Sequence, residues 1–270
     1  MKFIQITNDP QFAEKCVSAG IDRIMVDLET RGKAERQAHR DTLVSDHSPE
    51  DVASMAECMT TGELLVRVNP WHHGSIREVD QVVAGGANLI MLPMFRTANE
   101  VRLFVAAVDG RAGTCLLFET SSAVARIDDI LACPGIDEVY VGLNDLHVEM
   151  RLDFMFELVS GGLVSLLAQR FADAGLPFGF GGVAPEGQGP VSPTCILGEH
   201  ARLGSSRVIL SRGFRKACES QGPAAVQKNL QREVTNLRLI VDHWLKADGS
   251  LLAGNRDSLH AQVQSALAAK

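Results

Sequence analysis

Lysine is scarce in this sequence and absent from most of it. The chain has seven lysines in 270 residues, and none of them lies between residues 34 and 215. A lysine that forms a Schiff base with a carbonyl substrate has to lie in the active site itself. Schiff-base catalysis from any strand in that long central region is therefore excluded.

Basic clusters, long apolar runs and paired cysteines are missing as well. The formal net charge of −7, without a clustered basic face, argues against nucleic-acid binding. No run approaches the roughly 18 unbroken apolar residues of a membrane span. The six cysteines form no Cys-x-x-Cys pair, which predicts buried reduced thiols and no structural zinc. Because residues 1–10 read as a short strand and not as an export signal, we expect a soluble, cytoplasmic protein.

Short apolar runs rich in β-branched residues alternate with amphipathic stretches of helical length. This alternation is typical of a parallel sheet with crossover helices, and eight such runs predict a closed α/β fold, the (β/α)8 TIM barrel. We expect strands at 2–7, 23–28, 64–68, 88–93, 114–119, 137–143, 177–182 and 206–211. We expect helices at 10–19, 48–59, 76–84, 97–108, 121–132, 157–174 and 192–203.

The C-terminal tail carries more apolar surface than one barrel edge needs. Residues 223–246 repeat apolar side chains at helical spacing, and residues 250–268 form a second amphipathic stretch. We therefore expect a catalytic barrel at 1–215 and a C-terminal helical extension at 216–270. Part of that extension is predicted to pack on a neighbouring subunit in a homo-oligomer.

Two acidic residues follow neighbouring strands of the predicted barrel. The carboxyl ends of the strands form the active-site face, and the fifth and sixth runs end at Glu119 and Asp145. Two converging carboxylates can hold Mg²⁺ or Mn²⁺ and leave positions open for water and substrate. The alternative is that each acid caps the helix that follows it.

Other polar residues at strand ends are candidates for binding and proton transfer. Arg67 interrupts an apolar run and could bind a carboxylate or phosphate through paired hydrogen bonds, or could form an ion pair with Asp27 or Glu29. His47 and His147 follow strands and could exchange a proton near neutral pH. For the catalytic group we expect Arg67, Asp27, Glu29 and His47, and for substrate binding Arg67, Asn69, Gly181, Gly182 and Arg212. Gly179, Gly181 and Gly182 favour close approach of backbone to ligand over a nucleotide loop.

Several of these motifs, taken in order and spacing, resemble one known family. They are Asp27-Leu28-Glu29, Val66-Arg67-Val68-Asn69-Pro70, Leu92-Pro93, Phe118-Glu119-Thr120 with Ala123-Val124, and Gly142-x-x-Asp145-Leu146. Together they resemble the HpcH/HpaI aldolase and citrate lyase β-subunit family over about residues 20 to 150. The resemblance implies a (β/α)8 barrel that binds Mg²⁺ or Mn²⁺ through Glu119 and Asp145 and a 2-oxoacid through Arg67. It also implies trimers or hexamers with exchanged C-terminal helices.

The sequence departs from the aldolase branch of that family at two places. That branch has a histidine after the acids of the second strand and a glutamine two residues before the metal-binding glutamate, where this chain has Thr30 and Leu117. Leu117 is closer to the lyase branch. The base and the substrate are therefore not fixed by the resemblance.

The leading hypothesis is a metal-dependent carbon-carbon lyase or aldolase for a small hydroxy- or oxo-carboxylate. Without a lysine on the central strands, stabilisation of an enolate would fall to the metal. A second hypothesis is an enzyme that transfers or cleaves a phosphorylated enol such as phosphoenolpyruvate on the same barrel. A third is a barrel that has lost catalysis and serves in binding or assembly.

Overall fold

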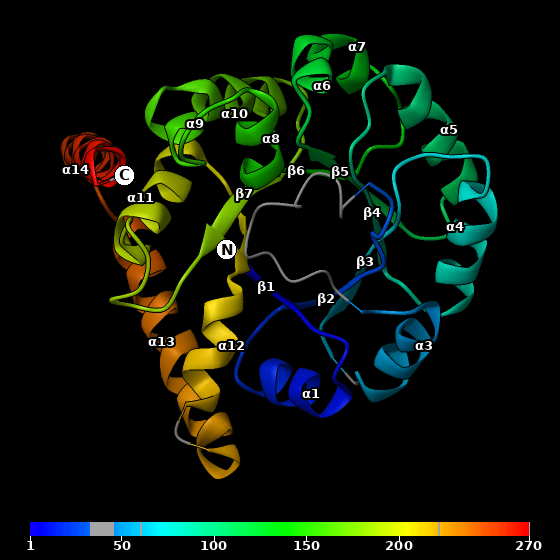
Figure 1. Cartoon of the computed structure of the whole chain (residues 1–270), viewed down its shortest axis with the longest axis horizontal. Helices are drawn as coiled ribbons and strands as arrows, with labels where there is room; N and C mark the ends of the chain where they lie inside the picture. Colours follow the sequence, from blue (N-terminus) through cyan, green and yellow to red (C-terminus); the bar gives the residue numbers. More distant parts are fainter. Residues whose placement is uncertain (33–45, 60, 221, 270) are drawn as a thin grey trace.

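Eight parallel strands close into one barrel in the computed structural model, which describes residues 1–32, 46–59, 61–220 and 222–269 (Figure 1). Each strand pairs with its neighbours in sequence, and β8 closes the ring on β1. The strands are β1 (Lys2–Ile6), β2 (Arg23–Asp27), β3 (Glu63–Arg67), β4 (Leu89–Leu92), β5 (Gly113–Phe118), β6 (Glu138–Val141), β7 (Phe178–Val183) and β8 (Arg207–Leu210). The predicted TIM barrel is confirmed.

A ring of helices covers the outside of the barrel (Figure 1). The helices are α1 (Pro10–Ser18), α3 (Pro49–Cys58), α4 (Ser75–Ala84), α5 (Ala98–Val108), α6 (Ser121–Ala125), α7 (Ile127–Leu131), α8 (Leu143–Glu149), α9 (Glu157–Ser160), α10 (Leu163–Asp173), α11 (Pro193–Leu203), α12 (Arg212–Glu219), α13 (Val226–Leu245) and α14 (Gly249–Ala268). Helices α3 and α5 begin with capping boxes at Ser48 and Thr97. In each box, an acidic side chain three residues later accepts the backbone N–H of the cap residue.

Three helix predictions need correction. The helix expected over 121–132 is two short ones that meet at Arg126, and the one expected over 157–174 is interrupted at Gly161 and Gly162. Gly162 has a φ of +88°, which a continuous α-helix does not allow. The third correction is α8, a helix directly after β6 where the sequence suggested that the strand ran on to residue 143.

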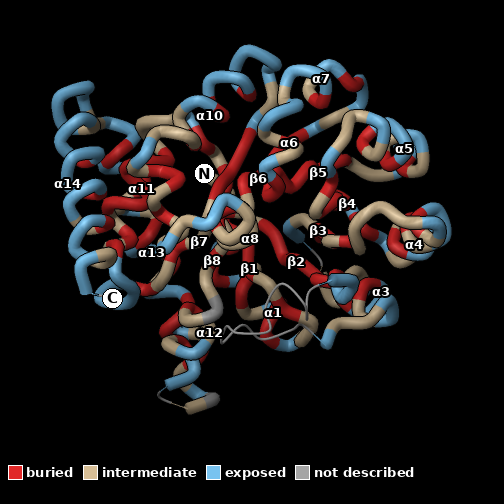
Figure 2. Tube along the Cα trace, turned by 45° about the horizontal axis from the view of Figure 1, so that its top comes forward, coloured by how far each residue is buried: buried red, intermediate tan, exposed pale blue. Residues whose placement is uncertain are grey.

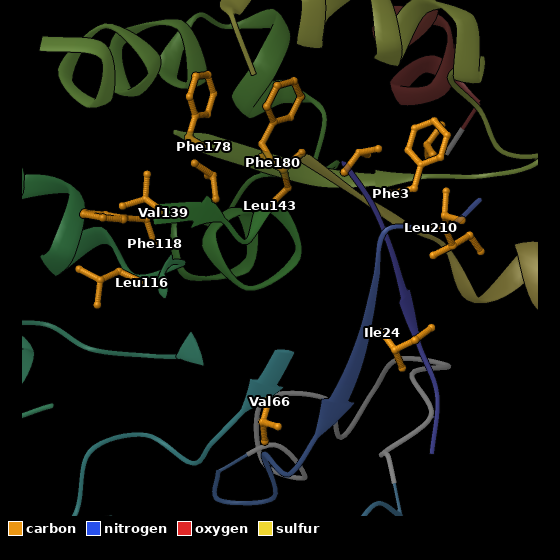
Figure 3. Packing of buried hydrophobic residues seen from close by; sticks show 14 of the residues in the cluster. Phe3, Ile24, Val66, Leu116, Phe118, Val139, Leu143, Phe178, Phe180 and Leu210 are labelled. Carbon is orange, nitrogen blue, oxygen red and sulfur yellow. The ribbon is translucent and has the colours of Figure 1, made fainter. Parts of the chain in front are cut away.

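Strand residues alternate between the barrel interior and the helix layer. The interior holds an apolar cluster that includes Met25, Leu65, Met91, Leu117 and Tyr140. The alternate residues point outward into the larger core between sheet and helices, where the ring of Phe180 stacks on that of His200 with centroids 3.8 Å apart. Figure 3 shows Phe178 and Phe180 projecting from β7 toward the helices. This two-sided burial explains why the strands read as continuous apolar runs.

Charged residues close the N-terminal end of the barrel. Arg23, Glu63, Glu138 and Arg207 are each the first residue of their strands. Arg23 donates to Glu138 Oε1 at 2.5 Å and to Glu63 Oε2 at 2.9 Å, and Arg207 Nε donates to Glu138 Oε2 at 2.6 Å. No motif in the sequence pointed to this network. Because it lies at the opposite end from the loops that carry chemistry, we assign it to stability.

Tyr140 bridges an irregularity between β7 and β8 from inside the barrel. The register changes from Gly179↔Arg207 to Gly182↔Ile209, so three steps on β7 face two on β8. The Tyr140 hydroxyl donates to Gly181 O at 2.6 Å and accepts the N–H of Ile209 at 2.9 Å. A Cβ at Gly179 would lie 2.4 Å from Tyr140 Cε2. We expected Gly179 to let a ligand approach the backbone, but it makes room for the Tyr140 ring instead.

The C-terminal tail packs on the barrel of its own chain. The apolar stripe of α13, from Val226 to Trp244, is buried and belongs to the main core, and α13 contacts α1, α11 and α12. Helix α14 lies at the edge of the molecule on α11, with its outer face exposed (Figure 2). The predicted domain boundary at 215/216 falls inside α12. Whether the extension mediates oligomerisation stays a prediction.

Two further expectations concern cysteines and membranes. All six cysteines are free, and five of them are buried while Cys58 is half-buried, which confirms the prediction of reduced core thiols. None of the helices in the described ranges is long and apolar enough to cross a bilayer.

Candidate active site

A cavity of about 330 Å³ opens at the C-terminal end of the barrel. Its floor is the top of the apolar interior, including Met25, Met91 and Ile209. Its polar wall carries Arg67 from β3, Glu119 from the end of β5 and Asp145 from α8. The structure therefore brings together the three residues on which the sequence hypothesis depended.

Glu119 is held at the cavity by a strained backbone neighbour. It follows β5 directly, its side chain is buried, and its Oε1 accepts the N–H of Met94 at 3.1 Å. Met94 has a φ of +54°, a left-handed conformation that is uncommon for residues other than glycine and that clusters at functional sites. No sequence pattern marks Met94, because the identity of a residue does not reveal its φ.

The helix-capping alternative does not hold for Glu119. The cap of α6 is the neighbouring Thr120, whose hydroxyl accepts the N–H of Ala123 at 3.1 Å. Asp145 does not end a strand as expected, because β6 ends at Val141 and Asp145 lies in the first turn of α8. The N-terminal end of a helix favours negative charge in its first turn. The N-cap of α8 is Gly142, which has no side chain to cap the helix.

Glu119 and Asp145 act on each other electrostatically. Burial raises the pKa of Glu119 well above its ordinary value, and the charges of Asp145 and Glu29 raise it further. Arg67 and the N–H of Met94 act in the opposite direction without cancelling the shift. The site thus concentrates carboxylates that repel one another, and a bound cation would relieve that repulsion.

Arg67 is fixed by two of the predicted catalytic acids. Its Nε and Nη2 donate to the two carboxylate oxygens of Asp27, each at 2.8 Å, and Nη1 lies 3.3 Å from Glu29 Oε2. Burial by itself would lower the pKa of Arg67, but Asp27 and Glu29 raise it above its ordinary value. The ion-pair alternative is therefore correct, and Arg67 also lines the cavity.

The two histidines near the site differ in the nitrogen that they present. His47 Nδ1 accepts the N–H of Asp27 at 2.9 Å, so the neutral ring carries its proton on Nε2. His147 is buried, and its Nδ1 lies 3.0 Å from the carbonyl of Leu143, which requires the proton on Nδ1. Neither residue is among those that line the cavity.

The predicted substrate-binding residues fall into three groups. Gly181 and Gly182 line the cavity. Asn69 instead joins loops, since its Oδ1 accepts the N–H groups of Thr30 and Arg31, each at 3.0 Å, while its Nδ2 donates to Glu78 at 2.8 Å. Arg212 begins α12, and its side chain lies outside the described part of the structure, as does most of the loop expected at 29–47.

Two carboxylates are a sufficient protein contribution for a hard cation. Mg²⁺ commonly takes one or two carboxylates and completes its shell with water and substrate oxygens. Within the described ranges, no cluster of three or more histidine, cysteine or acidic side chains has the arrangement of metal ligands. Glu119 and Asp145 are the residues here that could hold such an ion.

TIM-barrel enzymes carry their active sites at the C-terminal end of the barrel, where this chain has an arginine and an acidic pair. The sequence profile of the HpcH/HpaI aldolase/citrate lyase family matches residues 1–155. The chain belongs to this family. The match covers the site residues discussed above except those of β7, β8 and α12.

Curated relatives in this family are aldolases. The chain is 25% identical over 179 residues to a hydroxypyruvate/pyruvate aldolase of Roseovarius nubinhibens, covering 53% of this chain and 61% of the relative. It is 24% identical over 197 residues to a 4-hydroxy-2-oxovalerate aldolase of Novosphingobium aromaticivorans, covering 59% and 68%. The matched part therefore spans about two thirds or less of these relatives.

Solved structures of the family share the fold. An HpcH/HpaI aldolase from Desulfitobacterium hafniense superposes with a TM-score of 0.60 at 16% identity, covering 92% of this chain and 94% of the other. A family protein from Burkholderia cenocepacia gives a TM-score of 0.61 at 16% identity, covering 88% and 94%. At this identity the likeness concerns the architecture alone.

Proposed function

We propose that this protein is a divalent-metal-dependent carbon-carbon lyase or aldolase for a small 2-oxo- or hydroxy-carboxylate. The observation that carries the proposal is the convergence of Glu119, Asp145 and Arg67 on one cavity. Family membership and the aldolase names of the curated relatives support the reaction class.

Arg67 is assigned to the substrate carboxylate. Asp27 occupies the Nε and Nη2 edge of its guanidinium, which fixes the plane of the group and keeps it charged. A planar cation fixed in this way offers its remaining N–H groups in a defined direction, at little cost in side-chain entropy. Asp27 and Glu29 then serve to orient Arg67.

A divalent cation held by Glu119 and Asp145 would supply positive charge where negative charge develops on the substrate oxygen. The excess of carboxylates around Glu119 fits such an ion. His47 carries the proton of its neutral ring on Nε2, so Nε2 is the atom from which it would donate a proton. Asp27 and Glu29 remain candidates for accepting a proton.

The proposal is tested by hydrogen exchange in pyruvate. Purified protein with Mg²⁺ or Mn²⁺ in deuterated buffer is expected to exchange the methyl protons of pyruvate, as followed by proton NMR. Glu119→Gln and Asp145→Asn should lose this exchange and the binding of Mn²⁺. The matched control is Asp128→Asn, whose side chain is 72% exposed. Absence of exchange in the wild type, with and without an aldehyde, would contradict the proposal.

Assembly into a homo-oligomer, trimeric or hexameric, is part of the same proposal. Leu239 and Leu245 of α13 are more than half exposed, whereas the other apolar side chains of this helix are buried or, at Ile240, half-buried. Light scattering on the eluting peak of a gel-filtration column measures the mass of the assembly. A monomer mass of about 29.2 kDa would contradict this part of the proposal.

A further inference from the structure

The cavity is asymmetric in polarity. The polar wall belongs to β3, β5 and α8, whereas the opposite side, formed by β8 and β1, presents Ile209 and Ile6. The adjacent β7 contributes the backbone of Gly181 and Gly182. A ligand whose carboxylate lies at Arg67 therefore directs its other end toward hydrocarbon and peptide backbone.

Positive charge on the described part of the cavity wall is limited to one side chain. Among the described residues that line the cavity, Arg67 is the only cationic one, and Asp27 and Glu29 already face it. Even with a divalent cation in place, the negative charge of four carboxylates exceeds the positive charge of Arg67 and the cation together. These carboxylates are Asp27, Glu29, Glu119 and Asp145. A second anionic group on the ligand would meet no further cation among the described lining residues, and burying an anion without a cationic partner is strongly unfavourable.

The hydroxyl of Tyr140 does not supply the missing polar partner. This side chain lines the cavity floor, but its oxygen already donates to Gly181 O and accepts the N–H of Ile209. The Ser211 hydroxyl is the polar side chain left on the β8 side, and a neutral hydroxyl does not balance a carboxylate.

From this geometry we infer that the site selects monocarboxylic 2-oxo- or hydroxy-acids whose remaining substituent is uncharged and apolar. Dicarboxylates, tricarboxylates and phosphorylated acids are rejected. The inference rests on the proposed function and narrows its substrate class. It also separates this chain from any relative whose site holds a second anionic group.

Two ligands of similar shape test the inference with the wild-type protein. In the presence of Mn²⁺, calorimetry compares 5-methyl-2-oxohexanoate, which ends in an isopropyl group, with 2-oxoglutarate, which ends in a carboxylate at the same distance. The branched apolar acid is expected to bind at least fivefold more tightly. A smaller ratio, or tighter binding of 2-oxoglutarate, overturns the inference.

Pyruvate in the same buffer separates this failure from failure of the proposed function. If pyruvate binds only with Mn²⁺ while the two longer acids bind equally, the proposed function stands and the inference falls. If none of the three binds, both fall.

A substitution on the apolar side gives an independent test. Ile209→Arg places a cation opposite Arg67 and is expected to shift the preference at least tenfold toward 2-oxoglutarate. Ile209→Met, the control of similar reach without charge, should retain the wild-type preference. An equal shift in both variants would mean that shape and not charge decides, which contradicts the inference.

Discussion

Gly142 faces the carboxylate of Glu119 so closely that a Cβ at position 142 would lie 2.7 Å from Glu119 Oε2 and 2.8 Å from Glu119 Cβ. Gly142 is the N-cap of α8, the helix that carries Asp145. The acid pair can therefore converge only because the residue between β6 and α8 has no side chain.

We predict that Gly142→Ala displaces Glu119 and weakens Mn²⁺ binding at least tenfold, as measured by calorimetry. The control is Gly254→Ala on α14, where a Cβ meets nothing within 4 Å. That change should leave Mn²⁺ binding unaltered and raise the free energy of unfolding by about 0.5–1 kcal/mol, because alanine is the better helix former. Unchanged Mn²⁺ affinity in Gly142→Ala would remove Glu119 from the proposed metal site.

The proposed role of Arg67 in substrate binding can be separated from its role in stability. Arg67→Lys keeps a positive charge near Asp27 and Glu29 but loses the fixed planar fork, so pyruvate should bind at least tenfold more weakly in a folded protein. Arg67→Met leaves both buried acids without their cation and is expected to cost about 3–5 kcal/mol of unfolding free energy. Urea titration measures the second effect.

Arg170→Lys is the control for Arg67, because this arginine is half-exposed and lies 3.7 Å from an exposed aspartate. It should change neither pyruvate binding nor stability measurably. If Arg67→Lys binds pyruvate as the wild type does, Arg67 does not hold the substrate carboxylate.

Tyr140→Phe tests the bridge between β7 and β8. Loss of the hydroxyl leaves the N–H of Ile209 and the carbonyl of Gly181 without this partner, which should lower the free energy of unfolding by about 1–3 kcal/mol. The variant should also bind pyruvate more weakly, because Gly181 and Gly182 line the cavity. Full stability of Tyr140→Phe would contradict the bridging role.

The same residue offers a spectroscopic check, because Tyr140 is the only tyrosine of the chain. Burial raises its pKa above the ordinary value near 10. The folded protein should therefore show no tyrosinate absorbance as the pH passes 10, and the signal should appear only with unfolding. A titration centred near 10 in folded protein would place the ring in solvent.

Protonation of His200 is expected to lower the free energy of unfolding in mild acid. Burial lowers its pKa to about 3, while the unfolded chain titrates near 6.5. Between these values the unfolded state binds more protons, so the contribution is complete above about pH 6.5 and declines by up to roughly 1.4 kcal/mol per unit as the pH falls.

The variant His200→Phe keeps the stack on Phe180 and cannot titrate. Urea unfolding at pH 7, 6 and 5 should therefore show a shallower fall in stability for this variant than for the wild type. His260→Phe, on the exposed side of α14, should retain the wild-type slope. Parallel slopes for wild type and His200→Phe would contradict the prediction.

The sequence by itself determined the barrel and pointed to Arg67, Glu119 and Asp145, which line its C-terminal cavity. Strands buried on both faces are apolar along most of their length, so polar residues at or just after their C-terminal ends, such as Arg67 and Glu119, mark the active-site end. The spacing of the runs placed all eight strands within two residues of their observed ends. The end of the sixth run also pointed to Asp145, although the sequence placed it after a strand and not on a helix.

The tertiary structure decided how those residues meet. The roles of Met94, Gly142 and Tyr140 depend on a backbone angle, a missing Cβ and a shift of strand register, and none of these leaves a local pattern in the sequence. The pairing of Arg67 with Asp27 joins residues 40 positions apart, and the stripe of α13 could equally have covered a partner subunit. Such choices are settled by three-dimensional packing, because apolar periodicity specifies that a face is buried but not what covers it.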